Sequence, residues 1–407
     1  MTTTTNNEHK KLNAPNLRFP EFQGEWEEHY LSNYLDFKNG LNPKPDKFGK
    51  GIKFISVMDI LNNAVITNDC IRASVDVTED ELQSFCVENG DILFQRSSET
   101  LEDVGRANVY MDDKPAVFGG FVIRGKKKAE YNPLFFRYLL ASPFARKKII
   151  PMGAGAQHFN IGQEGLNKVK LHFASLGEQK KIAKLLSLLD ERIATQSKVI
   201  EDLKKLKCAI IDYTIDSIKA EYVEFSEMYE MAGEGGTPST SNMEYYENGR
   251  VPFIKIEDLK QKYLVSNKDY ITELGLQKSS AWLIPTNSIL FSNGATIGEI
   301  SITTYPVCTK QGILGIVPKV GIDTEYLYYL MSSRYFKKEI CRIITEGTMK
   351  TAYLKDINKI RCPVPPKFIQ QEIVKIPSAL NTKIETEQNI LNKFICQKQY
   401  LLRQMFI

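Results

Sequence analysis

The most regular hydrophobic pattern of the chain lies near its middle. Residues 178–207 read EQKKIAKLLSLLDERIATQSKVIEDLKKLK and contain neither proline nor glycine. Apolar residues recur at alternating steps of four and three, the heptad pattern of a helix that packs against another helix. The resulting seam consists of Ile182, Leu186, Leu189, Ile193, Ile200, Leu203 and Ile210, and it is interrupted by the polar residues Gln196 and Lys207. The pattern predicts a helix of about 40 residues, against a mean of about 11 to 12, whose seam needs a partner.

The same seam recurs 191 residues later, in residues 369–398, which read IQQEIVKIPSALNTKIETEQNILNKFICQK. The equivalent positions are Ile373, Pro377, Leu380, Ile384, Glu387, Leu391, Phe394, Lys398 and Leu401. The polar interruptions also recur, since Glu387 matches Gln196 and Lys398 matches Lys207. A shared period is common among helices, but shared interruptions are not, so we expect the second helix to cover the first.

The repeat extends upstream of both helices. IKFISVMDI (52–60) parallels VPFIKIEDL (251–259), and GDILFQ (90–95) parallels NSILFS (287–292). The other parallel pairs are NPLFFRYLLASPFARKKI (132–149) with TEYLYYLMSSRYFKKEI (324–340), and LNKVKLHF (166–173) with INKIRCPV (357–364). The chain therefore consists of two copies of one unit, each a globular part followed by a long helix. Short β-rich runs mixed with helices predict an α+β (mixed α/β) fold for each globular part.

These patterns divide the chain into five segments. We expect a flexible tail over 1–16, a globular domain over 17–176 and a long helix over 177–218, followed by a second domain over 219–366 and a second helix over 367–407. Pro377 occupies a seam position, and an interior proline removes a backbone hydrogen bond at a cost of about 3 kcal/mol. The second helix is therefore expected to be kinked at Pro377 or to begin near it.

Composition narrows the class of protein. A chain of 407 residues is long enough for two or three domains, and its net charge of +4 is nearly balanced, so any site for a polyanion must come from local patches. The seven cysteines are scattered and never spaced as CxxC, which predicts reduced thiols. The polar N-terminus and the absence of a run of roughly 18 apolar residues predict a cytoplasmic protein.

The sequence contains no constellation typical of an active site. It has no GxxxxGK[ST], HExxH or GxSxG motif, and GAGAQ (153–157) lacks the third glycine of a dinucleotide-binding turn. NPLF (132–135) is similar to an amino-methyltransferase motif but lacks its second proline. The four histidines are isolated, so no metal site is expected. These absences favour binding or scaffolding, and they leave two alternatives: an autonomous DNA methyltransferase or nuclease, and a structural coiled-coil dimer without a DNA role.

Three stretches carry a family resemblance: LRFPEFQGEWEEHYLSNYLDFKNG (17–40), the turns GLNP (40–43) and GTP (236–238), and LNKVKLHFASLGEQKKIAKLLSLLDERI (166–193). Together they resemble the specificity subunit of a bacterial type I restriction-modification system, over essentially the whole chain. The second helix departs from the pattern, because the Glu-Gln at its start is replaced by Gln370 and Gln371.

The resemblance implies that residues 17–176 and 219–366 are target recognition domains, each reading one half of a bipartite DNA target. It further implies that the two long helices pack antiparallel as a coiled-coil spacer, which sets the separation of the half-sites and docks two methyltransferase subunits. A restriction and translocase subunit would complete the complex. The catalytic sites, S-adenosylmethionine, ATP and Mg are then expected on the partner subunits, and no cofactor is expected on this chain.

Candidate DNA contacts are polar and basic side chains in loops that follow strands or precede the helix junctions, because such loops have a rigid support. In copy one, the candidates for base contacts are Gln95, Arg96, Ser97, Ser98, Gln157, His158 and Asn160, and those for phosphate contacts are Lys126, Lys127, Lys128, Arg146, Lys147 and Lys148. In copy two the candidates are Ser292, Asn293, Lys310, Gln311, Lys350, Thr351 and Tyr353. We expect the segments 95–98 and 346–353 to contribute as a whole.

Overall fold

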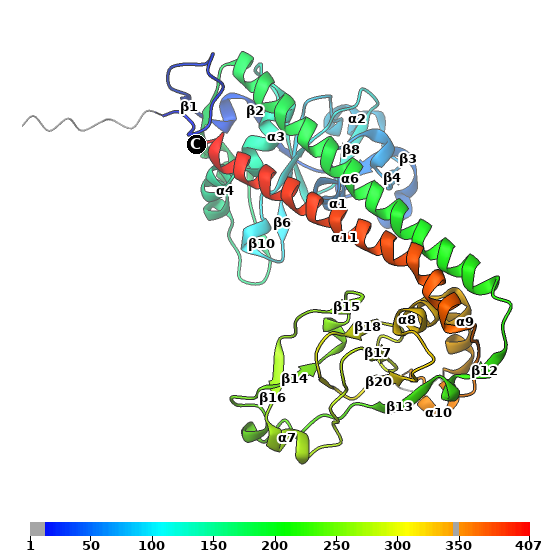
Figure 1. Cartoon of the computed structure of the whole chain (residues 1–407). Helices are drawn as coiled ribbons and strands as arrows, with labels where there is room; N and C mark the ends of the chain where they lie inside the picture. The colour runs from blue at the N-terminus through cyan, green and yellow to red at the C-terminus, as the bar shows by residue number, and fades with distance from the viewer. Residues whose placement is uncertain (1–12, 345–349) are drawn as a thin grey trace, which may run out of the picture. The chain divides into compact units, whose positions relative to one another are not determined.

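The computed structural model describes residues 13–344 and 350–407, and the chain divides into two compact units (Figure 1). Unit 1 comprises the residues up to 197 together with 389–407, and unit 2 comprises residues 198–388. Each unit thus contains one globular part, half of the first long helix and half of the second. The predicted mixed α+β class is confirmed.

Unit 1 is built on two small sheets. The first has the order β2-β9-β5-β7 and is antiparallel, and the second has the order β4-β3-β8, with β3 parallel to β8. Two further antiparallel pairs are β1 with β11 and β6 with β10. The strands are β1 (Glu27–Tyr30), β2 (Leu35–Asn39), β3 (Phe48–Ile55), β4 (Ser74–Val75), β5 (Ile92–Gln95), β6 (Ser97–Ser98), β7 (Ala107–Val109), β8 (Ala116–Phe118), β9 (Val122–Lys127), β10 (Phe159–Asn160) and β11 (Lys170–Phe173).

Unit 2 repeats this topology. Its larger sheet has the order β13-β20-β17-β18-β15, and its smaller sheet has the order β16-β14-β19, again with one parallel pair, β14 with β19. The strands are β12 (Tyr222–Glu224), β13 (Tyr229–Glu234), β14 (Val251–Ile254), β15 (Tyr263–Leu264), β16 (Asp269–Ile271), β17 (Ile289–Ser292), β18 (Ile300–Thr303), β19 (Cys308–Thr309), β20 (Ile313–Pro318) and β21 (Arg361–Pro363). The order and direction of four strands of the larger sheet and all three strands of the smaller one agree with unit 1, and the fifth strand, β15, is added parallel to β18. The duplication inferred from the sequence is therefore confirmed at the level of the fold.

The helices of the two copies also correspond, except that the first helix of copy one has a 3-10 helix (Ile256–Asp258) as its counterpart in copy two. Those of copy one are α1 (Val57–Asn62), α2 (Glu79–Phe85), α3 (Pro133–Ala141), α4 (Pro143–Ile149), α5 (Gln163–Asn167) and the long α6 (Leu176–Asp216), and those of copy two are α7 (Glu273–Gln277), α8 (Thr324–Ser332), α9 (Arg334–Ile343), α10 (Leu354–Ile357) and the long α11 (Lys367–Gln404). Side chains at matching positions cap them: Asn132 caps α3 as Asp323 caps α8, and Ser142 caps α4 as Ser333 caps α9. None of the described helices is long and apolar enough to cross a membrane.

Within each unit, the two long helices pack against one another and against the globular part. In unit 1 the core joins Leu186 of α6 and Leu401 of α11 to Phe135 and Phe136 of α3. In unit 2 it joins Ile211 of α6 and Val374 of α11 to the aromatic side chains of α8 and α9. All thirteen apolar seam residues named for the two helices are buried or half-buried. The seam is therefore covered within the chain, and its burial does not require a second molecule.

The polar interruptions of the seam make equivalent contacts in the two units. In unit 1 the Nζ of Lys398 lies 2.5 Å from Oδ1 of Asp190, and in unit 2 the Nζ of Lys207 donates to Oδ1 of Asn381 at 3.1 Å. Each lysine is 191 residues from the other, as are their partners. Burial lowers the pKa of Lys207. Since low-numbered residues of α6 meet high-numbered residues of α11 in unit 1, and the reverse holds in unit 2, the pairing is antiparallel in each.

One buried glutamine joins the start of each long helix to its globular part. Oε1 of Gln179 accepts from the backbone N–H of Asn132 at 2.9 Å, and its Nε2 donates to the carbonyl of Ala174 at 2.9 Å. Gln370 makes the same two bonds, accepting from the N–H of Asp323 at 2.8 Å and donating to the carbonyl of Pro365 at 2.8 Å. Gln370, and not the exposed Gln371, is thus the counterpart of Gln179.

We expect Gln179→Ala and Gln370→Ala each to lower the free energy of unfolding of their own unit by roughly 2 to 3 kcal/mol, because each leaves a buried N–H and a buried carbonyl without a partner. Gln371→Ala is the control and should change stability by less than about 0.5 kcal/mol. Urea unfolding measures all three. Equal effects of Gln370→Ala and Gln371→Ala would contradict the assignment.

Two expectations about segment boundaries need correction. α11 begins at Lys367, ten residues before Pro377, so the helix does not begin at the proline; Pro377 is buried inside it. The predicted flexible tail is wrong for residues 13–16, because the carbonyl of Asn13 accepts from the N–H of Trp26 at 2.7 Å, Asn16 donates to Gln404 at 3.3 Å and Pro15 is buried. Residues 1–12 lie outside the described part of the chain.

Candidate nucleic-acid interface

Three segments of copy one meet where strand β5 ends. They are residues 95–98, the turn 119–121 between β8 and β9, and the loop 154–160, and we refer to them together as edge 1. The N–H of Arg96 donates to the carbonyl of Phe121 at 2.8 Å, and the N–H of Ile161 donates to the carbonyl of Arg96 at 2.9 Å. The backbone of Arg96 therefore ties the three segments together; β6 and β10 in Figure 1 belong to this edge.

Copy two builds the same arrangement at the end of β17. The described segments are residues 292–294, the turn 310–312 and residues 350–353, which we call edge 2. The N–H of Asn293 donates to the carbonyl of Gly312 at 3.0 Å, and the N–H of Ala352 donates to the carbonyl of Asn293 at 2.9 Å. These are the counterparts of the two bonds of Arg96. One backbone framework thus carries different side chains in the two copies.

Edge 1 contains all seven predicted base contacts of copy one. Ser97 pairs with Asn160 across β6 and β10, and the hydroxyl of Ser97 donates to the Asn160 carboxamide. Gln157 and His158 are exposed in the loop that precedes β10. Gln95 and Ser98, in contrast, are buried. In the structure as it stands, these two side chains support the edge from inside and do not present donors to solvent.

Gln95 and Arg96 also hold the edge through their side chains. Nε2 of Gln95 donates to the carbonyl of Ser97 at 2.9 Å, and Nη1 of Arg96 donates to the carbonyl of Gly120 at 3.1 Å. The Oε1 of Gln95 is buried without a hydrogen-bond partner. Arg96 is half-buried, so part of its guanidinium remains accessible to a ligand.

Edge 2 divides in the same way. Lys310, Gln311, Lys350 and Tyr353 are exposed, and Thr351 is half-buried. Ser292 and Asn293 are buried; the hydroxyl of Ser292 donates to the carbonyl of Thr296 at 2.6 Å, and Nδ2 of Asn293 donates to the carbonyl of Ala352 at 3.3 Å. They support the edge as Gln95 does. Residues 346–349 of the predicted segment lie outside the described residues.

The lysine run 126–128 does not lie at edge 1. Strand β9 runs antiparallel to β5, and Val122 pairs with Gln95, so Lys126 and Lys127 are at the opposite end of the sheet. There Lys126 lies 2.6 Å from Glu88, and Lys127 lies 3.4 Å from Glu130. A run of basic residues in the sequence does not reveal at which end of an antiparallel strand it falls.

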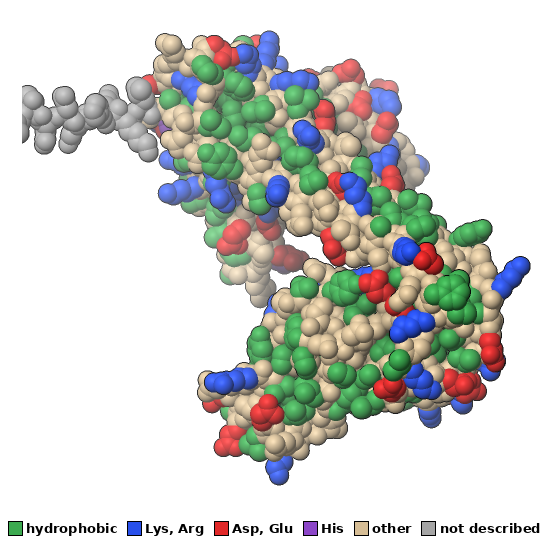
Figure 2. All heavy atoms as spheres, in the orientation of Figure 1, with side chains coloured by type: hydrophobic (Ala, Val, Ile, Leu, Met, Phe, Trp, Pro, Cys, Tyr) green, Lys and Arg blue, Asp and Glu red, His purple; other side chains and the backbone are tan. Residues whose placement is uncertain are grey.

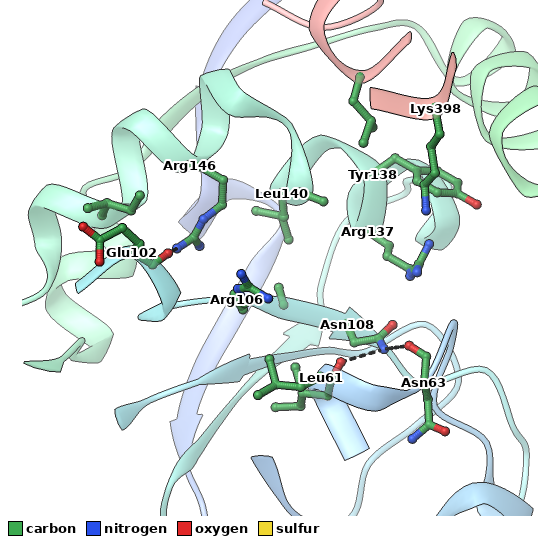
Figure 3. Close-up of a pocket in the computed structure, with 15 residues that line it drawn as sticks. Leu61, Asn63, Glu102, Arg106, Asn108, Arg137, Tyr138, Leu140, Arg146 and Lys398 are labelled. Atoms are coloured by element: carbon green, nitrogen blue, oxygen red, sulfur yellow. Dashed lines mark hydrogen bonds between the residues drawn. The ribbon is translucent and has the colours of Figure 1, made fainter. Parts of the chain in front are cut away.

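Arg146 lines an open cleft of unit 1 with a volume of 430 Å³ (Figure 3). Its Nη2 donates to the carbonyls of Glu102 and Val104 at 2.8 and 2.7 Å, and its Nη1 is buried without a hydrogen-bond partner. Burial, with a smaller contribution from the charge of Arg106, lowers the pKa of Arg146 to about 10. Arg146 thus holds the backbone of residues 102–104, which follow residues 95–98 of edge 1 in the sequence. Lys147 and Lys148, beside it on α4, are exposed.

Two other cations of this cleft, Arg137 and Lys398, share one carboxylate. Arg137 lies 3.1 Å and Lys398 2.5 Å from Asp190, and the hydroxyl of Tyr138 donates to the same carboxylate at 2.8 Å. Burial raises the pKa of Tyr138. This cluster connects α3, α6 and α11 in unit 1.

The correspondence between the two copies identifies further residues that were not among the predicted DNA contacts. The turn Gly119–Phe121 is the counterpart of the turn that carries the predicted Lys310 and Gln311. It can be identified from the sequence by aligning AVFGGFVI (116–123) with the corresponding stretch of copy two. Likewise Lys337 and Lys338 on α9 are exposed counterparts of Arg146 and Lys147. On the face shown in Figure 2, basic and acidic side chains are interspersed, as the small net charge suggests. The described residues contain no group of His, Cys, Asp or Glu side chains arranged to hold a metal ion.

Comparison with protein families gives the class of the chain. Residues 23–205 and 218–394 each match the model of the type I restriction modification DNA specificity domain. The chain belongs to this family and contains two copies of its domain.

Individual relatives agree with this assignment. The MjaVIII specificity subunit of a type I restriction enzyme of Methanocaldococcus jannaschii is 23% identical over 400 residues, covering 91% of this chain and 89% of the relative. The EcoR124I/EcoR124II specificity subunit of Escherichia coli is 28% identical over 237 residues, covering 52% of this chain and 58% of the relative. The crystal structure of the type I S subunit from M. genitalium superposes with a TM-score of 0.56 at 17% identity, covering 97% of this chain and 99% of that one, which shows a shared fold.

Proposed function

We propose that this chain is the non-catalytic DNA-recognition subunit of a type I restriction-modification complex, in which each unit reads one half of a bipartite duplex target. The observation that carries the proposal is the pair of edges: the same two backbone hydrogen bonds build both, yet one carries a Gly-Gly-Phe turn and the other a Lys-Gln-Gly turn. An identical frame with different side chains suits two readers of different sequences.

In this proposal, the long helices dock two methyltransferase subunits and set the separation of the half-sites. The support is that both helices expose large apolar side chains away from the seam, an arrangement typical of protein interfaces. On α6 these are Leu188, Val199, Leu206 and Tyr213, and on α11 they are Phe368, Ile376, Ile395 and Tyr400. The methyltransferase subunits would bind S-adenosylmethionine, and a restriction and translocase subunit would use ATP and Mg.

The direct test is a binding assay with the chain in complex with its methyltransferase partner, together with methylome sequencing of a host with and without the gene. We expect one bipartite motif to lose its methylation when the gene is removed, and the complex to prefer that motif over random duplex. No preference for any split sequence would refute the proposal.

The two alternatives make different predictions. An autonomous methyltransferase would bind S-adenosylmethionine as an isolated chain, so saturable binding in a titration would favour it. A coiled-coil dimer would bury its seam between molecules, whereas here the seam is covered within each unit. Neither alternative has a structural observation in its favour.

Phosphate contacts can be separated from base contacts by salt dependence. Lys147→Ala/Lys148→Ala should weaken binding similarly for all sequences and reduce the slope of log K against log salt by about 2, since each phosphate contact contributes roughly 0.9. Lys126→Ala/Lys128→Ala removes the same charge at the other end of the sheet and should leave the slope unchanged. Equal slopes for the two double variants would contradict the placement of the phosphate contacts on α4.

A further inference from the structure

A patch of exposed apolar side chains borders edge 1. Phe48, Met58 and Phe121 are 42%, 61% and 68% exposed, respectively. All three line a surface groove of 400 Å³, together with Leu41, Pro43, Phe54 and Val57. Exposed apolar side chains that gather around a hollow, unlike scattered ones, mark binding surfaces. The carbonyl of Phe121 accepts from the N–H of Arg96, so the patch is continuous with edge 1.

The turn that carries Phe121 is held rigidly. A Cβ added at Gly119 would lie 2.7 Å from the ring of Phe54, and one added at Gly120 would overlap the carboxamide of Asn42. A side chain at either position would therefore require Phe54 or Asn42 to move. The carbonyl of Gly120 is also bound by Arg96 at 3.1 Å. A rigid turn presents an aromatic ring to a ligand at little cost in conformational entropy.

Unit 2 is an internal control for the role of this patch. Asp59 accepts from the N–H of Ser56 at 2.7 Å, and Asp258 accepts from the N–H of Lys255 at 2.9 Å, which aligns the segments around them. Met58 then corresponds to Glu257.

Phe121 corresponds to Gly312, because Phe121 and Gly312 accept the equivalent backbone bonds at edges 1 and 2. Unit 2 builds the same sheets without either apolar side chain. The fold therefore does not require the patch, which indicates that the patch in unit 1 binds a ligand.

We infer that the Phe121 patch contacts the 5-methyl group of a thymine in the half-site read by unit 1. This inference rests on the proposed function and names a base within it. The thymine methyl is the apolar group on base edges in the major groove, whereas the remaining edge atoms there are hydrogen-bond donors and acceptors that an apolar hollow would leave unpaired. A concave apolar surface receives a methyl group, in contrast to the single projecting wedge with which proteins unstack base steps.

Replacing thymine by uracil removes only this methyl group, so it gives a direct test. The chain in complex with its methyltransferase partner is titrated with duplexes in which each thymine of the bipartite motif is replaced in turn. We expect one position, in the half-site of unit 1, to weaken binding about 3- to 10-fold. Phe121→Ala should weaken binding to the thymine duplex by a similar factor. This variant should then bind the thymine and uracil duplexes with equal affinity.

Two further variants distinguish loss of the thymine contact from a general loss of folding. Met58→Glu introduces the residue that unit 2 carries and should reproduce the effect of Phe121→Ala. Phe144→Ala removes an exposed aromatic ring of α4 and should leave the thymine preference intact.

If Phe121→Ala lost affinity but no position were sensitive to uracil, the thymine contact would be refuted, and the result would favour a Phe121 that inserts as a wedge between base steps. Uracil sensitivity that survives Phe121→Ala would overturn it as well. If the wild-type complex preferred no bipartite sequence, the proposed function itself would fail, a result distinct from either of these.

Discussion

Glu178→Ala should lower the free energy of unfolding of unit 1 by roughly 3 kcal/mol. The carboxylate of Glu178 is fully buried at the start of α6 and accepts from Nε and Nη2 of Arg18, both at 2.7 Å, and from the indole N–H of Trp26 at 3.2 Å. Removing it leaves the Arg18 guanidinium, whose side chain is only 16% exposed, without its counter-charge. Breaking such a pair costs about 3 to 5 kcal/mol. We expect the lower end, because Nη1 of Arg18 still donates to the carbonyl of Gly24 at 2.6 Å.

Urea unfolding followed by Trp26 fluorescence measures this effect in unit 1. The chain has two tryptophans, so the measurement is made in a Trp282→Phe background. Ile369, the counterpart of Glu178 on α11, has no such pair, and replacing both Arg18 and Glu178 by leucine should recover most of the loss, because an apolar pair leaves no buried charge. If Glu178→Ala and the double variant were equally unstable, the loss would come from packing and not from an unpaired charge.

Local periodicity is why the long helices could be predicted. A heptad seam is a property of neighbouring positions, and the recurrence of Lys207 as Lys398 identifies the repeat from the order of residues alone. Of the two expectations for Pro377, a kink or a start of the second helix near it, the second is wrong because it weighed only the local cost of proline. Packing of Ile373, Val374 and Ile384 along the helix outweighs that cost.

The candidate interface was harder to predict because burial of a loop side chain depends on distant segments. Gln95 and Ser292 are the last residues of β5 and β17, and only Arg96 and Asn293 directly follow these strands. Ser292 and Asn293 are buried by contacts with Thr296 and Ala352. The Phe121 patch could not be predicted for a related reason: single apolar residues in a sequence are typical of the core. Their clustering becomes evident only when the turn 119–121 lies beside edge 1.

Asp190→Ala should destabilise unit 1 by about 3 to 5 kcal/mol, whereas Asn381→Ala, at the equivalent position of unit 2, should cost only about 1 kcal/mol. The difference follows from the partners. Asp190 neutralises both Arg137 and Lys398 and accepts from the hydroxyl of Tyr138, so its loss leaves two half-buried cations without a carboxylate. Asn381 carries no charge; it accepts one hydrogen bond from Lys207 and donates one to the exposed Glu385 at 2.7 Å.

The repeat makes this pair of substitutions a matched experiment, because each removes the partner of a seam lysine at the equivalent position of the repeat, Lys398 in unit 1 and Lys207 in unit 2. Trp26 fluorescence in the Trp282→Phe background reports on unit 1, and Trp282 fluorescence in a Trp26→Phe background reports on unit 2. Asp190→Asn keeps the size of the side chain and removes its charge, so it should fall between the two alanine variants. Equal losses for Asp190→Ala and Asn381→Ala would mean that the seam lysines stabilise the helix pair through their aliphatic stems and that the charge shared by Arg137 and Lys398 contributes little.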